Sequence, residues 1–295
     1  MDDGDGIKFN YSEWMLRIDD ERPIRLISIP GTHDSCAYHG TLSWYSKPIS
    51  RCVITQEKNI SEQLQMGIRY LDIRCRHVNN SFNIHHGNFN LNTTFQSVLR
   101  NVIDFLKQFP TETILMRIKE EHKPVGNSRS FPDTMNSYFN ENDFKEYFWR
   151  DSYSYDSYDI FRNDHDPKLA ECRGKIVILQ NFNGYQFGLG YKSFFDIQDD
   201  YTVTSYELKR ASIKKCISIA KDFEVFKKGL INHLSGVGSL GFNPTPLGVA
   251  KKTNTFMRTC LQNEKEMVEY VGIVPADFPD QKLIHLIIST NFGNK

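Results

Sequence analysis

Two kinds of hydrophobic pattern alternate along almost the whole chain. Short apolar runs bounded by glycine, proline or asparagine are typical of buried strands, and they predict strands over 24–29, 68–74, 82–86, 113–119, 175–179, 198–203, 230–234 and 271–274. Between these runs, apolar residues recur at helical spacing, which predicts a short capping helix within 9–20 and further helices over 61–66, 94–108, 133–149, 205–226, 249–269 and 280–290.

This order of elements favours one fold class. Strands and helices alternate about seven or eight times, and several strands are apolar throughout, as in a parallel sheet covered by helices. With 295 residues, a closed α/β barrel is more economical than an open sheet. We therefore expect a single barrel domain over residues 1–295, with residues 1–22 as an N-terminal capping segment.

The composition limits the possible partners and compartments. Lysine plus arginine and aspartate plus glutamate each number 36, so no global charge attracts nucleic acid or an anionic membrane, and any lipid contact must be local. No apolar stretch approaches 18 residues, and the acidic N-terminus is unlike a secretory signal. We expect a monomer in the cytoplasm or peripheral at a membrane surface, or a secreted protein if a signal was removed. The six cysteines are scattered without C-x-x-C spacing, as in a protein with reduced thiols, which argues against a cysteine zinc site.

Polar residues gather where the predicted strands end. The clearest case is 27–35, where Pro30 and Gly31 interrupt an apolar run and are expected to turn the chain, so that His33 and Asp34 follow in a loop. In an α/β barrel, catalytic groups lie at the C-terminal ends of the strands. The polar residues at the ends of the predicted strands are His33, Asp34, Asp72, Arg74, His85, His86, Arg117, Lys119, Asn181, Asp199, Tyr201 and Asp277.

Spacing and residue type indicate a chemistry for this set. Asp72 and Arg74 are two residues apart on one strand and share a face, as do Arg117 and Lys119, which should point into the barrel. Two histidines, an arginine and carboxylates suit phosphoryl transfer, in which one imidazole takes a proton, the other gives one, and the guanidinium stabilises phosphoryl charge. This set requires no metal. A structural Asp-x-Arg ion pair, a solvated Lys119 and a structural or metal-binding histidine pair remain alternatives.

Several motifs occur together in a familiar order and spacing. The strongest are Ser28–Ser35, Tyr70–Arg74 and Ile84–Gly87, and the weaker ones are 173–177, 197–201 and 277–279. From about residue 14 to residue 292 the sequence resembles the metal-independent, bacterial-type phosphatidylinositol-specific phospholipases C. The resemblance implies a distorted TIM barrel that needs no cofactor. It also implies cleavage of phosphatidylinositol, in which the inositol 2-hydroxyl attacks the phosphorus to give diacylglycerol and inositol 1,2-cyclic phosphate.

The resemblance also implies roles for individual residues. His33 corresponds to the general base and Asp277 to its paired carboxylate, whereas His86 corresponds to the general acid, assisted by Asp34. Strand periodicity alone does not choose between His85 and His86 as the acid. Arg74 stands where calcium-dependent relatives keep an acidic metal-binding residue.

Further positions match the part of the family's site that binds the head group. Asp72 would orient Arg74 or the phosphate environment, and the inositol contacts would be Lys119, Asp199 and Tyr201. The chain departs from the family at Asn181, where an arginine is usual. We hypothesise that Arg117 supplies part of the lost contact. The departure leaves open whether plain, phosphorylated or glycan-bearing inositol lipids are substrates.

Lipid contact requires apolar side chains on the loops that should rim the barrel. The candidate membrane contacts are Leu42, Trp44, Tyr45 and Phe242, with Val53, Leu240 and Leu247 nearby. These residues could instead pack on their own loops. Two other functions remain as alternatives: a metal-dependent glycerophosphodiester phosphodiesterase and a catalytically silent inositol-lipid binding module.

Overall fold

The computed structural model describes residues 9–41, 47–150, 166–221, 227–238, 244–263 and 268–293. Eight parallel strands of one sheet follow one another in the order β8-β9-β10-β1-β2-β5-β6-β7. Their bounds are β1 Ile29–Thr32, β2 Tyr70–Val78, β5 Ile114–Glu120, β6 Ile176–Asn181, β7 Leu189–Gly190, β8 Phe195–Gln198, β9 Gly229–Asn232 and β10 Ile273–Ala276. Apart from the hairpin that follows β2, this is the chain-order sequence of a (β/α) barrel. Within the described ranges no strand pairing joins β7 to β8, so the protein is a distorted TIM barrel, nearly closed, as expected.

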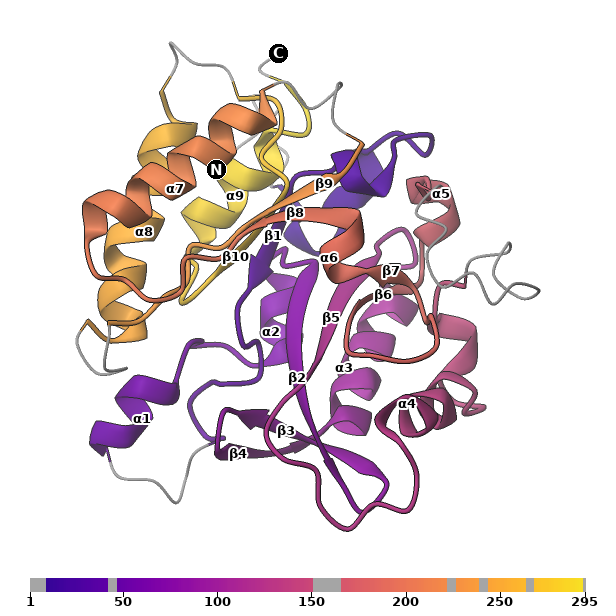
Figure 1. The fold of residues 1–295 in the computed structure, drawn as a ribbon. Coiled ribbons are helices and arrows are strands. Elements are labelled where there is room, and N and C mark those ends of the chain that lie inside the picture. Colours follow the sequence, from indigo (N-terminus) through magenta and orange to yellow (C-terminus); the bar gives the residue numbers. More distant parts are fainter. Residues whose placement is uncertain are drawn as a thin grey trace.

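Helices cover the outside of the sheet (Figure 1). In the figure, α7, α8 and α9 lie beside β8, β9 and β10, while α3 and α4 lie on the side of β2, β5 and β6. The helices are α1 Lys47–Val53, α2 Ile60–Gln65, α3 Phe95–Gln108, α4 Phe131–Phe139, α5 Leu169–Cys172, α6 Tyr191–Phe194, α7 Tyr206–Ala220, α8 Pro246–Leu261 and α9 Gln281–Ser289, with 3-10 turns η1 Tyr11–Arg17, η2 Ile24–Leu26 and η3 Lys145–Tyr147. None of the described helices is both long and apolar enough to cross a membrane.

The sequence prediction located most of these elements, but it missed the short elements α5, α6 and β7, and several of its bounds were wrong. The strand predicted over 24–29 begins only at Ile29, because the residues after Pro23 form η2. The strand predicted over 198–203 was wrong, because β8 (Phe195–Gln198) overlaps it only at Gln198 and residues 199–203 lie in a loop. The helix predicted over 133–149 ends at Phe139. Strand β4 (Phe89–Thr94), which forms a hairpin with β3 (Ser81–His86), was not predicted at all.

The N-terminal segment closes the end of the barrel at which the strands begin. Trp14 is fully buried in η1, and its Nε1 donates to the carbonyl of Gly67, 3.0 Å away. Arg69, just before β2, forms a fully buried ion pair of 2.7 Å with Glu112, just before β5. Glu112 also accepts from the backbone N–H of Met15. These contacts join η1 to the N-terminal ends of two strands and leave the C-terminal ends as the open mouth of the barrel.

Candidate active site

The residues after β1 turn sharply into the mouth of the barrel. Pro30 and Gly31 lie within β1, so the expectation that they form the turn was wrong. A Cβ at Gly31 would come within 2.7 Å of the Tyr70 ring, so glycine is needed there for the close approach of β1 and β2. The turn comes at Asp34, whose φ of 45° lies in the left-handed region that aspartate tolerates better than most residues.

His33 is held between a carboxylate and a guanidinium. Its Nδ1 lies 2.8 Å from Oδ1 of Asp277, and its Nε2 lies 2.6 Å from Nη2 of Arg74. Because a guanidinium only donates, Nε2 must accept, and the ring proton is on Nδ1 and is donated to Asp277. Burial and the nearby Arg74 charge hold the pKa of His33 well below its ordinary value, so the ring is neutral. Burial also raises the pKa of Asp277 well above its ordinary value.

Arg74 is the centre of the charged groups at the mouth. Its Nη2 lies 3.2 Å from Oδ2 of Asp72, and its Nη1 lies 3.3 Å from Oδ2 of Asp34. Burial alone would raise the pKa of Asp72, but Arg117 and Arg74 outweigh it and lower that pKa, so Asp72 is ionised. Arg74 therefore contacts two carboxylates and a neutral imidazole, all within a buried site.

His86 lies across from His33, with ring centroids 6.5 Å apart and planes nearly perpendicular. Its Nδ1 donates to the carbonyl of Val53 at 2.8 Å and lies 3.3 Å from Oδ2 of Asp34. Nε2 is therefore the nitrogen left for a substrate. Its neighbour His85 is buried beside His122 with ring centroids 5.9 Å apart, and burial lowers the pKa of His85 to about 4.

Arg117 and Asn181 form one unit. Two nitrogens of Arg117 donate to Oδ1 of Asn181, at 3.0 and 2.8 Å, and Nη1 lies 3.4 Å from Oδ1 of Asp72. The guanidinium also stacks over the ring of Tyr191, 4.2 Å from its centroid. The structure thus brings Arg117 to the position beside Asn181 that the sequence hypothesis requires.

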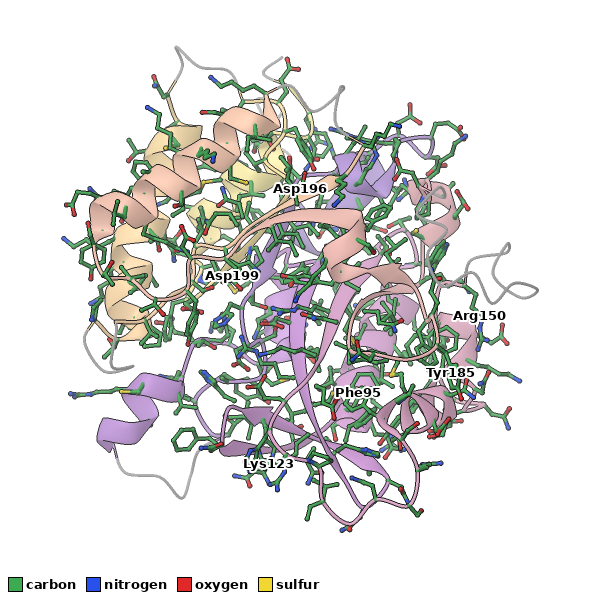
Figure 2. All side chains as sticks on the ribbon, viewed as in Figure 1. Phe95, Lys123, Arg150, Tyr185, Asp196 and Asp199 are labelled. Atoms are coloured by element: carbon green, nitrogen blue, oxygen red, sulfur yellow. The ribbon has the colours of Figure 1, made fainter. Side chains whose placement is uncertain are left out.

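The remaining predicted head-group contacts lie around this centre at different depths. Lys119 pairs with Glu121 at 2.8 Å, and about a third of its side chain is exposed. The Tyr201 ring lies 5.7 Å from that of His33, and burial raises the pKa of Tyr201 to about 12. Asp199 is exposed just after the end of β8 (Figure 2) and makes no direct contact with His33 or His86.

Sequence reasoning missed a third histidine at this site. His233 follows β9, is fully buried, and lies perpendicular to His33 with centroids 6.2 Å apart. Its Nε2 lies 2.9 Å from the hydroxyl of Tyr191. Burial lowers the pKa of His233 to about 4, so it is neutral. Its position at a strand end was the same signal that identified the other residues.

Other expected features lie elsewhere. Leu42, Trp44, Tyr45, Leu240 and Phe242 fall outside the described residues. Val53 is buried, whereas Leu247 is 40% exposed.

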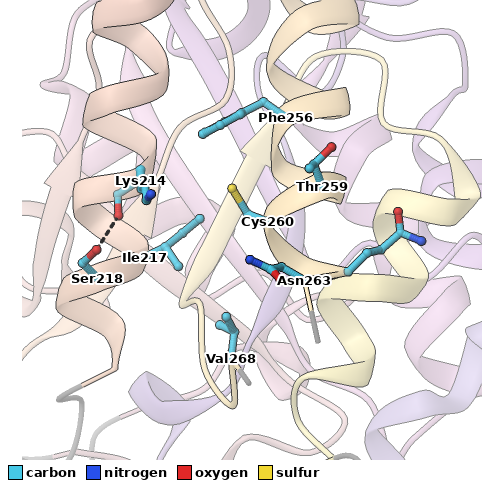
Figure 3. A pocket seen from close by; sticks show the side chains of 9 residues that line it. Lys214, Ile217, Ser218, Phe256, Thr259, Cys260, Asn263 and Val268 are labelled. Atoms are coloured by element: carbon cyan, nitrogen blue, oxygen red, sulfur yellow. Dashed lines mark hydrogen bonds between the residues drawn. The ribbon is translucent and has the colours of Figure 1, made fainter. Parts of the chain in front are cut away.

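Among the described residues, no cluster of three or more histidine, cysteine or acidic side chains could hold a metal ion. A pocket of about 390 Å³ lies away from the mouth, between α7 and α8, and is lined by residues such as Ile217, Phe256 and Cys260 (Figure 3).

Comparison with known proteins assigns the chain to a family. Residues 27–182 match the family model for the phosphatidylinositol-specific phospholipase C X domain. A 1-phosphatidylinositol phosphodiesterase of Listeria monocytogenes is 32% identical over 292 residues, which cover 96% of this chain and 86% of that relative. The chain belongs to the phosphatidylinositol-specific phospholipase C family.

Solved structures agree with this family assignment. The phosphatidylinositol-specific phospholipase C from Listeria monocytogenes has a TM-score of 0.80 at 32% identity, covering 97% of this chain and all of that one. A variant of the Staphylococcus aureus enzyme has a TM-score of 0.82 at 23% identity, covering 97% and 98%, and supports the fold alone. As a member of this phospholipase C family, the chain is an enzyme.

Proposed function

We propose that this family member cleaves phosphatidylinositol to diacylglycerol and inositol 1,2-cyclic phosphate, using its own side chains as base, acid and phosphate ligand. The observation that carries the proposal is the arrangement of two histidine–carboxylate pairs around one arginine. His33 with Asp277 and His86 with Asp34 lie on either side of Arg74. A base and an acid on opposite sides of a phosphate-binding cation are what an in-line displacement at phosphorus requires.

The first half of the reaction belongs to His33. In the free enzyme its Nε2 accepts from Arg74, and phosphate oxygens would draw that guanidinium away because they carry full negative charge. Nε2 is then open to take the proton of the inositol 2-hydroxyl as its oxygen bonds to phosphorus. Asp277 would stabilise the imidazolium that forms.

The second half belongs to His86. As the bond between phosphorus and the diacylglycerol oxygen breaks, that oxygen takes a proton from His86. Because Nδ1–H is engaged by the carbonyl of Val53 and by Asp34, the proton comes from Nε2. His86 must therefore enter the reaction as an imidazolium, whose charge Asp34 stabilises, and it leaves as the neutral ring protonated on Nδ1. The cyclic diester forms because the nucleophile is the neighbouring hydroxyl of the same ring, held against phosphorus by the site.

The head group is proposed to lie over Arg117, Asn181 and Tyr201, with Lys119 and Asp199 at its exposed edge. Arg117 keeps its planar donor fork beside Asn181 and can replace hydrogen bonds that an arginine at position 181 would have made. Asp72, ionised between two arginines, would hold both in place without contacting inositol. Glycan-bearing phosphatidylinositol would need room at this same edge.

We also propose that the protein acts as a monomer and contacts the membrane only briefly, because its substrate is a lipid. The contact would be made by the loops at the rim of the barrel mouth. Leu42, Trp44, Tyr45 and Phe242 stay the candidates on the sequence alone, since each follows a predicted strand whose end carries a polar residue of the site. Replacing Trp44 and Phe242 should weaken vesicle binding and spare hydrolysis of a soluble substrate, whereas equal losses on both would refute the interfacial role.

The two alternatives are less well supported. A metal-dependent glycerophosphodiester phosphodiesterase needs clustered acidic ligands, yet Arg74 lies between Asp34 and Asp72, where it would repel a cation. A silent binding module would have no need of the paired histidines.

An assay with labelled phosphatidylinositol tests the proposal, because the wild type should release diacylglycerol and His33→Ala should not. Release that is lost only in chelator would favour the metal-dependent enzyme.

A further inference from the structure

Lys209 is an unusual residue in α7. Most helix lysines extend into water, but this side chain is only 2% exposed. Its Nζ donates to the carbonyl of Asp200 at 3.0 Å and to Oε1 of Gln198 at 3.3 Å. Gln198 is the last residue of β8, and Asp200 lies in the turn that follows, which also carries Asp199 and Tyr201.

Gln198 extends this anchor to the neighbouring strand. Its Oε1 also accepts from the backbone N–H of Asp200 at 2.8 Å. Its Nε2 donates to Oδ1 of Asn232 at 2.8 Å and to the carbonyl of His233 at 3.0 Å. Lys209 and Gln198 therefore tie the turn both to α7 and to the end of β9.

The turn in its anchored form places Tyr201 beside the catalytic base. The N–H of Tyr201 donates to the carbonyl of Asp199, and its own carbonyl accepts from Val237 at 2.9 Å. The Tyr201 ring then lies 5.7 Å from that of His33. A shift of this turn would move both proposed inositol contacts while leaving His33, His86 and Arg74 on their own strands.

Burying an ammonium group is costly, and no described carboxylate forms a direct ion pair with Lys209. A methionine of similar length would pack in the same space without that cost. What the lysine adds is a pair of donated hydrogen bonds to the turn. We propose that Lys209 is a positioning residue for the head group, and that it holds the 198–201 turn so that Asp199 and Tyr201 face inositol. This inference rests on the proposed function and adds a residue to it.

The charge of Lys209 should make this anchor depend on pH. Burial lowers the pKa of Lys209 to about 8, opposed by Asp199 and Asp200 on the turn and by Asp277 after β10. His233, after β9, is neutral in this range, and Glu207 and Arg210 lie on α7 itself. Above about pH 8 the ammonium loses its charge and its attraction to the turn weakens, so head-group binding should weaken too.

Stability should change in the opposite direction. The folded pKa of Lys209 lies below its ordinary 10.5, so between about pH 8 and 10.5 the unfolded chain binds more protons than the folded one. This group therefore raises the free energy of unfolding as pH rises through that window. A loss of head-group binding there would not be a loss of fold.

The test uses Lys209→Met and Lys209→Arg in the full chain, with Lys215→Met, an exposed lysine of the same helix, as the matched control. We measure KM and kcat for phosphatidylinositol in detergent micelles and the binding of free myo-inositol by NMR, from pH 7 to 9.5. Lys209→Met should raise KM about tenfold, keep kcat within about twofold and remove the weakening of binding near pH 8. Lys209→Arg should restore KM, and Lys215→Met should match the wild type.

The outcomes separate the two proposals. If the wild type cleaves phosphatidylinositol but Lys209→Met leaves KM and inositol binding unchanged, the positioning role is wrong. If the wild type does not cleave the lipid but Lys209→Met still weakens inositol binding, the proposed reaction fails and the anchor stands. If Lys209→Met does not fold, the pH dependence of inositol binding by the wild type is the test. Binding that stays constant from pH 7 to 9.5 would overturn the inference.

Discussion

Nη2 of Arg74 lies 2.6 Å from Nε2 of His33, the nitrogen through which this histidine would act as a base. The contact keeps the imidazole neutral and its lone pair occupied until something attracts the guanidinium more strongly. A phosphodiester does so, because it offers charged oxygens in place of a neutral acceptor. Binding of the substrate phosphate and exposure of the base would then be one event.

This contact predicts a coupling between Arg74 and the pKa of His33. Arg74→Ala should raise the pKa of His33, because one of the charges that now lowers it is gone. Turnover should fall at least a hundredfold with the loss of phosphate stabilisation. NMR titration of the histidine ring measures the shift, with Arg100→Ala, at an exposed position of α3, as a control remote from His33. An unchanged pKa would mean that Arg74 does not act on the base.

The role of His86 can be tested through the leaving group. His86→Ala should slow cleavage of phosphatidylinositol by about a hundredfold to ten-thousandfold, because the alkoxide of diacylglycerol leaves poorly without a proton. With a nitrophenyl ester of inositol phosphate, whose leaving group needs no proton, the loss should be far smaller. His33→Ala should impair both substrates alike. Equal losses for His86→Ala on both substrates would assign His86 another role.

The hypothesis for Arg117 concerns binding more than chemistry. Arg117→Ala should raise KM for phosphatidylinositol about tenfold and lower kcat less, because the contact lies at the head group and is present in the ground state. Arg100→Ala, on the exposed face of α3, serves as control. If Arg117→Ala leaves both affinity and turnover unchanged, the hypothesis is wrong.

Asp72 should matter for stability as well as for the site. Asp72→Asn leaves Arg74 and Arg117 without their shared carboxylate, and we expect a loss of about 3 kcal/mol or more in the free energy of unfolding near pH 7. Since the folded pKa of Asp72 lies below its unfolded value, its contribution is complete above the unfolded pKa and is lost as pH falls toward the folded one. Urea unfolding from pH 7 down to pH 3 measures this. The wild type should converge toward the variant at low pH, and a constant difference would count against the ionised Asp72.

Sequence pattern predicted the parts of this protein that depend on local spacing. Strand ends placed His33, Asp72, Arg117 and Asn181 at one mouth, and the structure brings them together. The sequence pattern did not predict β4, because the alternating asparagines of 88–92 are typical of a loop and only pairing with β3 makes them a strand.

The sequence pattern could not predict contacts between residues on opposite sides of the barrel. The ring of Tyr191, which the prediction placed in no element, lies under Arg117 and reaches His233 from a different part of the sheet. Lys209 has the sequence context of an ordinary surface lysine, and only the packing of α7 against the turn after β8 buries it. Such relationships depend on tertiary structure, so no single segment contains the signal.

Phosphorus NMR of the products formed from phosphatidylinositol in excess chelator tests the central claim most directly. The account predicts that a cyclic phosphodiester resonance appears first, at an undiminished rate, and that His33→Ala does not produce it. Direct appearance of only the acyclic inositol monophosphate would contradict the mechanism.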